Sequence, residues 1–109
     1  MDAVTALSGS GPAYVFYFLE AMQQAGVELG LTPAQASKLG LHTFLGAAQL
    51  AAASGDDFVS LRAQVTSKGG TTEQAINSME ASQIKAAIIL AVNAAAERSR
   101  QLGDLLAKD

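Results

Sequence analysis

Residues 32–54 run TPAQASKLGLHTFLGAAQLAAAS and decide the fold, because they contain both the start signal and the length of a long helix. Thr32 can accept a hydrogen bond from an otherwise unpaired amide, and Pro33 suits the first helical position. Gln35 follows three residues after the cap, which completes a capping box. The pattern predicts a helix from Pro33 to about Ser54.

Upstream of this segment, a second helix is expected to run from Pro12 to Leu29. Proline has a fixed φ that suits a first turn, and Gly30 is a natural left-handed residue for the end of the helix. One face of the expected helix is formed by Val15, Phe18, Leu19, Met22 and Gly26.

Downstream, three further helices are expected. Asp56 is placed to cap a short one that contains Phe58, Leu61, Arg62 and Val65. Thr71 and Gln74 repeat the capping-box spacing and predict another, whose buried face is Ala75, Ile76 and Met79. The last helix has apolar residues at helical spacing, namely Ile84, Ala87, Ile88, Ala91, Val92 and Ala95. Because Ala81-Ser82 is a weak break, the sequence leaves open whether the last two helices are separate.

The composition predicts one all-α domain over residues 1–109, a bundle of about five helices. No run of residues alternates in the manner of a strand, and Ala, Leu, Gln and Glu dominate. The net charge of −3 and only seven Lys and Arg residues argue against nucleic-acid binding. Cysteine is absent, no metal site is expected, and no apolar run is long enough to span a membrane. We therefore expect a soluble, cytoplasmic protein.

The low charge content also indicates a partner. Hydrophobic residues make up 50% of the chain and charged residues 16%, so much apolar surface must be covered by packing. Small residues on the helix faces would allow close approach of helix axes, namely Gly40, Gly46, Ala47, Ala48, Ala51, Ala87, Ala91 and Ala95. A homodimer or larger homo-oligomer is expected. The alternative is a tightly packed monomeric bundle.

Residues 66–72, TSKGGTT, are expected to form a loop that leads into the fourth helix. Such a loop would offer unpaired amides, hydroxyl groups and the positive end of the helix dipole to an anion. Glycines allow amides to converge where a Cβ would intrude. The alternative is a connector between two helices, and the spacing of a phosphate-binding P-loop is absent.

Other polar and aromatic residues have structural interpretations. His42 lies mid-helix without a second histidine or a carboxylate at ligand spacing, so we expect no metal or catalytic role. The aromatic run over 14–18 is expected to serve core or interface packing. The carboxylates are spaced like solvated helix faces, and they are Glu20, Glu28, Glu73, Glu80 and Glu97.

The glycine-rich segments and their order resemble the C-terminal domain of pyrroline-5-carboxylate reductases over nearly the whole chain. The segments are SGSGPAY at 8–14, GAA at 46–48, LR at 61–62, VTSKGGTT at 65–72 and AI at 75–76. The resemblance implies a domain that dimerises by interlocking helices. It also implies a separate Rossmann domain that binds NADPH or NADH, and an active site between the two kinds of domain.

The resemblance further implies that this loop binds pyrroline-5-carboxylate, which the enzyme reduces to proline in the last step of proline biosynthesis. The substrate carboxylate would be held at Ser67, Gly69, Gly70 and Thr71. Thr72 would lie near the ring nitrogen and the nicotinamide, as both a substrate-binding and the catalytic residue. A protonated cyclic imine is already an electrophile, so positioning can supply most of the catalysis.

Two residues depart from the family pattern. Lys68 stands where proline is common, and His42 where glutamine is common. No G-x-G-x-x-G follows a strand, so a Rossmann dinucleotide site is not expected in this chain. We expect a fragment that is inactive as a reductase when isolated. The rival interpretations are a free-standing or engineered helical dimerisation module and a different two-domain dehydrogenase of similar architecture.

Overall fold

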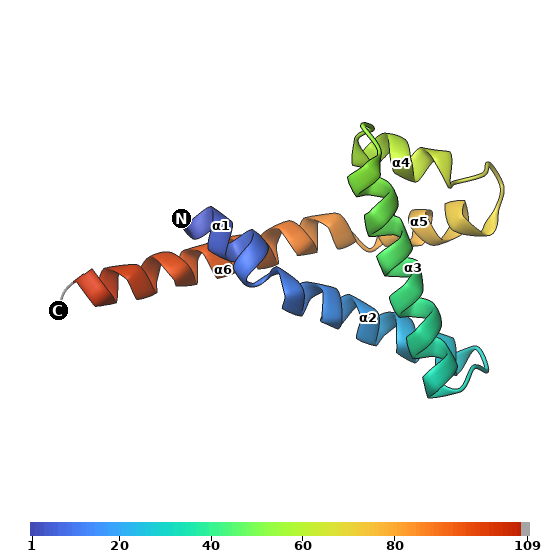
Figure 1. Ribbon diagram of the computed structural model, residues 1–109, viewed down its shortest axis with the longest axis horizontal. Coiled ribbons are helices and arrows are strands. Elements are labelled where there is room, and N and C mark those ends of the chain that lie inside the picture. Colours follow the sequence, from blue (N-terminus) through green and yellow to red (C-terminus); the bar gives the residue numbers. More distant parts are fainter. Residues whose placement is uncertain (108–109) are drawn as a thin grey trace. The chain divides into compact units, whose positions relative to one another are not determined.

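The computed structural model describes residues 1–107 and confirms the all-α prediction, with no strand in this range (Figure 1). Two short segments come first, α1 (Asp2–Val4) and the π-helix η1 (Thr5–Gly9). Five longer helices follow: α2 (Gly11–Glu28), α3 (Pro33–Ala53), α4 (Phe58–Gln64), α5 (Thr71–Ala81) and α6 (Ile84–Ala107). They form two compact units, one of residues 16–74 and one that joins residues 1–15 to those from 75 onward.

In the unit of residues 16–74, the turn between α2 and α3 is built from the signals expected there. Gly30 has a φ of 108°, and its amide donates to the Val27 carbonyl at 3.0 Å. The Leu31 amide donates to the Gly26 carbonyl, also at 3.0 Å, which completes a Schellman motif. Because only glycine adopts this φ without strain, Gly30 fixes where α2 ends.

The capping box at the start of α3 is also confirmed. The Gln35 amide donates to Thr32 Oγ1 at 3.1 Å, and the Thr32 amide donates to Gln35 Oε1 at 3.0 Å. The helix ends at Ala53, one residue short of the predicted end. The turn and the cap together set the direction in which α3 leaves α2.

Small residues bring α2 and α3 close together. Ala36 and Gly40 are the buried residues of α3. A Cβ at Gly26 would lie 2.9 Å from the Ala36 Cβ, which is too short for two carbons. A Cβ at Gly40 would be in ordinary contact with Leu19 and Met22. The face predicted for α2 is therefore the one that packs on α3, and close packing at Gly40 is confirmed.

The cap of α4 corrects the sequence prediction by one residue. Asp57, and not Asp56, is the N-cap, and its Oδ1 accepts from the Ser60 amide at 2.8 Å. That hydrogen bond lowers the pKa of Asp57 below its ordinary value. Asp56 instead accepts from Gln64 Nε2 at 2.9 Å. Both aspartates precede an apolar run, so spacing alone could not separate the two roles.

In the other unit, α1 and η1 lie along α6 (Figure 1). Ser99 Oγ donates to Asp2 Oδ1 at 2.8 Å, which ties α1 to α6. Ala6 of η1 is fully buried, and its carbonyl accepts from the Tyr14 hydroxyl at 2.6 Å. This segment was not predicted as a helix, because its main anchor comes from a residue 97 positions away.

The structure settles the question of whether α5 and α6 are separate. Gln83 has a φ of 56°, a left-handed conformation that interrupts the helix between Ala81 and Ile84. The predicted buried face of α5 is largely wrong, because Ala75 and Met79 are exposed and Ile76 is half-buried. Within the described residues α5 therefore lacks a packed apolar face.

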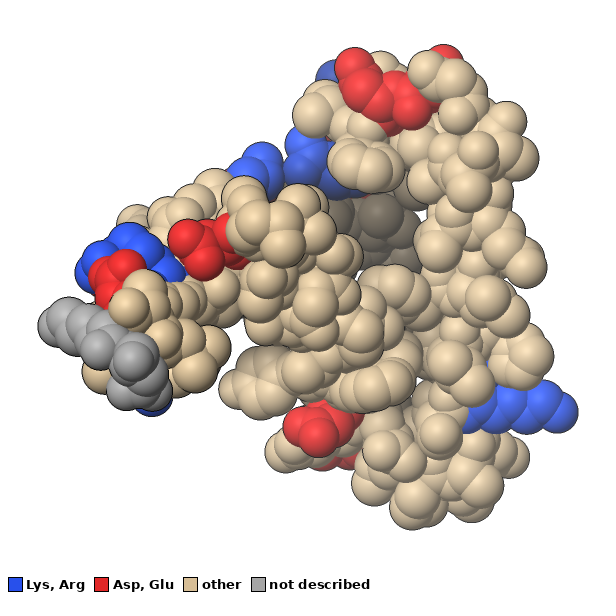
Figure 2. All heavy atoms as spheres, turned by 60° about the vertical axis from the view of Figure 1, so that its left-hand side comes forward, with Lys and Arg blue, Asp and Glu red and all other residues tan. Residues whose placement is uncertain are grey.

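Little apolar surface is buried in the described chain. Ala6 and Ala36 are its only buried hydrophobic residues. Every residue from 81 to 91 is exposed, including Ile88 and Leu90 at 53% and 69%. Figure 2 shows a face on which most atoms belong to uncharged residues. Within each unit, apolar side chains therefore stay exposed along whole helix faces.

Candidate anion site at the start of helix α5

The loop of residues 66–70 contains a tight turn. The Gly70 amide donates to the Ser67 carbonyl at 3.0 Å, which closes a four-residue β-turn. Gly69, the third residue of the turn, has a φ of 77°. A type II turn requires a positive φ at this position and commonly has proline at the second, which is Lys68 here. Gly69 therefore has a structural reason in the turn.

The second glycine is confined as well. A Cβ at Gly70 would lie 3.2 Å from the Ser67 carbonyl oxygen and 3.5 Å from the Ser67 Cβ. Any side chain there would press on the backbone that closes the turn. Upstream, Thr66 Oγ1 donates to the Arg62 carbonyl at 2.6 Å and joins the loop to the end of α4.

The start of α5 lies one residue earlier than the capping box predicted. Gln74 donates its amide to the Gly70 carbonyl at 3.3 Å, so Gly70 precedes the helix and Thr71 is its first residue. Glu73 reaches back, and its Oε1 accepts from the Gly69 amide at 3.0 Å. Glu73 is partly exposed, and what the sequence did not predict is its bond to the loop. The acidic residue three positions after a possible cap was the signal that could have revealed it.

The glycine amides are therefore paired within the loop, contrary to the expectation that they are free. The amides of Thr71, Thr72 and Glu73 precede the first intrahelical bond and lack a carbonyl partner in the helix. The Ser67, Thr71 and Thr72 side chains are exposed beside them. A helix start of this kind attracts an anion through its amides and its dipole. The structure brings all five predicted residues, 67 and 69–72, into one stretch of turn and first helical turn.

The remaining sequence candidates lie elsewhere or pack structurally. His42 is exposed on α3. No group of acidic, histidine or cysteine side chains in residues 1–107 could hold a metal ion. Tyr14 is anchored to η1 as described above, and the Phe18 ring meets the Phe44 ring edge-on at 6.0 Å. These two aromatic contacts match the predicted packing role, whereas Phe16 and Tyr17 are exposed at 64% and 76%.

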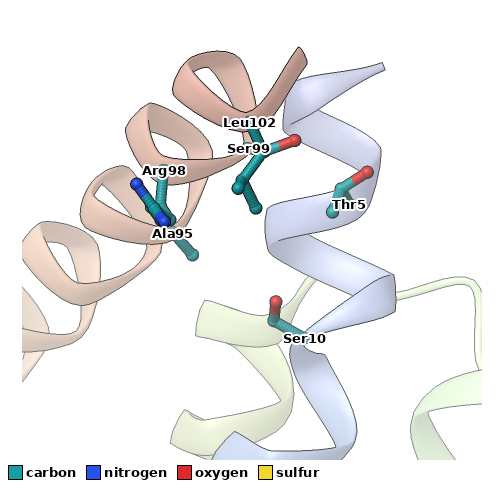
Figure 3. A pocket seen from close by; sticks show the side chains of 6 residues that line it. All are labelled: Thr5, Ser10, Ala95, Arg98, Ser99 and Leu102. Carbon is teal, nitrogen blue, oxygen red and sulfur yellow. The ribbon is translucent and has the colours of Figure 1, made fainter. Parts of the chain in front are cut away.

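A cleft of about 310 Å³ lies in the unit that contains α6 (Figure 3). Its lining comes from η1, from the residue that follows η1 and from α6, and consists of Thr5, Ser10, Ala95, Arg98, Ser99 and Leu102. Arg98 donates to Gln101 at 3.3 Å, and Ser99 is bonded to Asp2. No predicted site residue lines this cleft. Among residues 1–107 no helix is long and apolar enough to cross a membrane.

The family model and the most similar known proteins point to the same family. A family model described as pyrroline-5-carboxylate reductase dimerisation matches residues 1–102. Pyrroline-5-carboxylate reductase from Pseudomonas aeruginosa is 51% identical over 106 residues, which cover 97% of this chain and 39% of that protein. The enzyme from Corynebacterium melassecola is 48% identical over 103 residues, 94% of this chain and 38% of that protein.

Solved structures agree with the sequence relatives. The Plasmodium falciparum pyrroline carboxylate reductase with NADP bound has a TM-score of 0.91 at 37% identity, and the match covers 94% of this chain and 41% of that chain. A pyrroline-5-carboxylate reductase from Coxiella burnetii has a TM-score of 0.89 at 46% identity, and the match covers 93% of this chain and 37% of that chain. The chain thus spans about two fifths of the length of the relatives it matches.

Proposed function

Because the chain belongs to the pyrroline-5-carboxylate reductase dimerisation family, we propose that it is the dimer-forming and substrate-holding domain of such an enzyme. The reaction is the reduction of pyrroline-5-carboxylate to proline. A hydride adds to the carbon of the protonated C=N bond, and the nitrogen keeps the proton. The observation that supports a substrate role is the start of α5, where exposed hydroxyls adjoin amides without helical partners.

In this proposal the substrate carboxylate binds at the turn and the first residues of α5. The amides of Thr71 and Thr72 and the Ser67 hydroxyl donate to it, while Gly69 and Gly70 shape the turn. The Thr72 hydroxyl contacts the ring nitrogen region and holds the imine for reduction. No acid or base is required of the chain, because the protonated imine is already electrophilic and the domain contributes orientation.

The cofactor is assigned to another part of the enzyme. Residues 1–107 have no strand, and a Rossmann dinucleotide site needs a glycine-rich turn between a strand and a helix. The described residues therefore do not fit NADPH or NADH by themselves. The Plasmodium falciparum relative was solved with NADP bound. When bound in the parent enzyme, the nicotinamide supplies the hydride. The cytoplasmic location expected from the sequence stays a prediction.

The dimer is supported by exposed apolar surface. A folded monomer of 11.2 kDa exposes about 5,700 Å², whereas this chain exposes 8503 Å². The excess of about 2,800 Å² per chain, or about 5,600 Å² for two chains, is of the size of a large obligate dimer interface. Much of it is apolar, as in the exposed stretch 81–91 at the start of α6. We propose that a second copy covers this stretch.

Kinetics on the intact reductase test the substrate role. Thr72→Ala removes a hydroxyl worth about 0.5–1.5 kcal/mol, which corresponds to a several-fold loss of kcat/KM. Gly70→Val should be more harmful, because its side chain would meet the Ser67 carbonyl. Ser78→Ala, on the exposed surface of the same helix, is the control and should be neutral. If Thr72→Ala and Gly70→Val both retain full activity, the loop is only a connector.

A further inference from the structure

The hydrogen bond between Glu73 and Gly69 has no place in the substrate contacts proposed above. Glu73 Oε1 accepts from the Gly69 amide at 3.0 Å, across the turn and back from the first turn of α5. Thr71, Thr72 and Gln74 beside it are exposed, whereas Glu73 is half-buried. A side chain directed back onto the loop, instead of into solvent, constrains that loop.

Few other interactions constrain the part of the loop that contains Gly69 and Gly70. Gly69 lies at a positive φ, which glycine adopts readily but does not prefer strongly over other conformations. The helix begins with a long bond of 3.3 Å between the Gln74 amide and the Gly70 carbonyl. The Glu73 carboxylate links the turn to α5, because the backbone of Glu73 belongs to α5 and the amide that donates to its side chain belongs to Gly69 of the turn. A charged acceptor forms the stronger kind of hydrogen bond.

Resting on the proposed function, we infer that Glu73 is a positioning residue for the substrate site. It holds Gly69 in the turn conformation before substrate arrives, so that the Ser67 hydroxyl and the first amides of α5 already have the arrangement a carboxylate needs. A loop ordered in advance loses less conformational entropy when the ligand binds. Glu73 itself does not contact the substrate, and its contribution is to binding rather than to the chemical step.

The alternative outcome of the test is that Glu73 hinders substrate binding. A carboxylate on the Gly69 amide could act as a competitor that the substrate carboxylate must displace. In that case every substitution that removes the charge would strengthen substrate binding. The half-buried side chain and the closed turn favour the positioning role, because they describe a formed loop rather than an obstructed one.

The experiment compares Glu73→Ala and Glu73→Gln in the intact reductase. Glu73→Ala should raise the KM for pyrroline-5-carboxylate roughly 2- to 10-fold with little change in kcat, as expected for loss of a binding contribution. Glutamine keeps an acceptor oxygen at the same reach and should restore a near-normal KM. Glu80→Ala is the matched control in α5, since Glu80 lies at the other end of the helix near Lys85.

Hydrogen exchange at Gly69 in the same proteins separates this inference from the proposed function. Exchange at Gly69 should quicken several-fold in Glu73→Ala but not in Glu73→Gln or Glu80→Ala. Unchanged exchange in Glu73→Ala, an unchanged KM, or a KM that falls in both Glu73 variants would overturn the positioning role while leaving the reductase assignment standing. If Gly69 exchange responds but Thr72→Ala and Gly70→Val keep full activity, the substrate role of the loop fails and the positioning role with it.

Discussion

Gly26→Ala tests the packing that directs α3 away from α2. In an exposed helix interior this substitution stabilises by about 1 kcal/mol, because glycine loses more backbone entropy on folding than alanine. At Gly26 the new methyl would lie 2.9 Å from the Ala36 Cβ. Carbon atoms prefer about 3.5–4.0 Å, so the two helices would have to separate by roughly 1 Å. The Ala36 methyl is fixed to its backbone and cannot rotate away.

The cost of overpacking and the gain in helix propensity together decide whether Gly26→Ala raises or lowers the unfolding free energy. Overpacking a close contact costs about 1–3 kcal/mol, and the helix gain offsets about 1 kcal/mol of it. Gly26→Ala should therefore lower the unfolding free energy by up to about 2 kcal/mol. Ala36→Gly in the same molecule removes the opposing methyl. The double variant should recover most of the overpacking cost, with an interaction energy of about 1–3 kcal/mol.

Chemical denaturation at one fixed protein concentration is the assay, because dissociation of an oligomer would otherwise shift the midpoint. Gly103→Ala in α6 is the control, since nothing lies within 4 Å of a Cβ built there. That variant should stabilise by up to about 1 kcal/mol, because only the helix-propensity gain acts there. If Gly26→Ala stabilises the chain as much as Gly103→Ala does, or if the double variant shows no interaction energy, the close approach of α2 and α3 is refuted.

Three other outcomes are expected. Lys68→Pro, at the second position of the turn, should stabilise by about 0.4–1 kcal/mol in thermal unfolding and keep reductase activity in the intact enzyme. Asp57→Ala should lower the melting temperature more than Asp56→Ala does. The Asp57 contribution, present above its ordinary pKa of 3.8, should be lost as the pH falls below that value. The 109-residue chain alone should sediment as a dimer at micromolar concentration and should not oxidise NADPH with pyrroline-5-carboxylate; an 11.2 kDa species or steady turnover would contradict this.

The sequence predicted well those helix ends at which only one nearby residue is suited to the capping position. Gly30 directly follows the last apolar residue of the α2 pattern, and the structure gives it the left-handed φ expected there. Thr32 and Gln35 have the capping-box spacing with proline between them, and both hydrogen bonds form. In such places local chemistry alone is enough to specify the backbone conformation.

The features that the sequence missed or left open depend on distant contacts or on unfavoured conformations. The segment formed by α1 and η1 is held by hydrogen bonds from Ser99 and Tyr14, and no local sequence pattern predicts these bonds. The break before α6 needs a positive φ at Gln83, and glutamine has no preference for that conformation. The buried face of α5 was predicted incorrectly, because helical spacing marks an apolar face without saying which chain covers it.

The one-residue shift at the start of α5 bears on the chemistry as well as on the helix boundary. Had Thr71 been the cap, as its spacing from Gln74 suggested, its hydroxyl would have bonded a helix amide and been removed from the site. With Gly70 before the helix and Glu73 bonded to Gly69, the capping role leaves the Thr71 side chain exposed beside Thr72. Glycine is accepted at a cap, and a carboxylate is a stronger acceptor than an amide oxygen. Gly70 and Glu73 thus leave the side chains of Thr71 and Thr72 exposed, as the proposed substrate site requires.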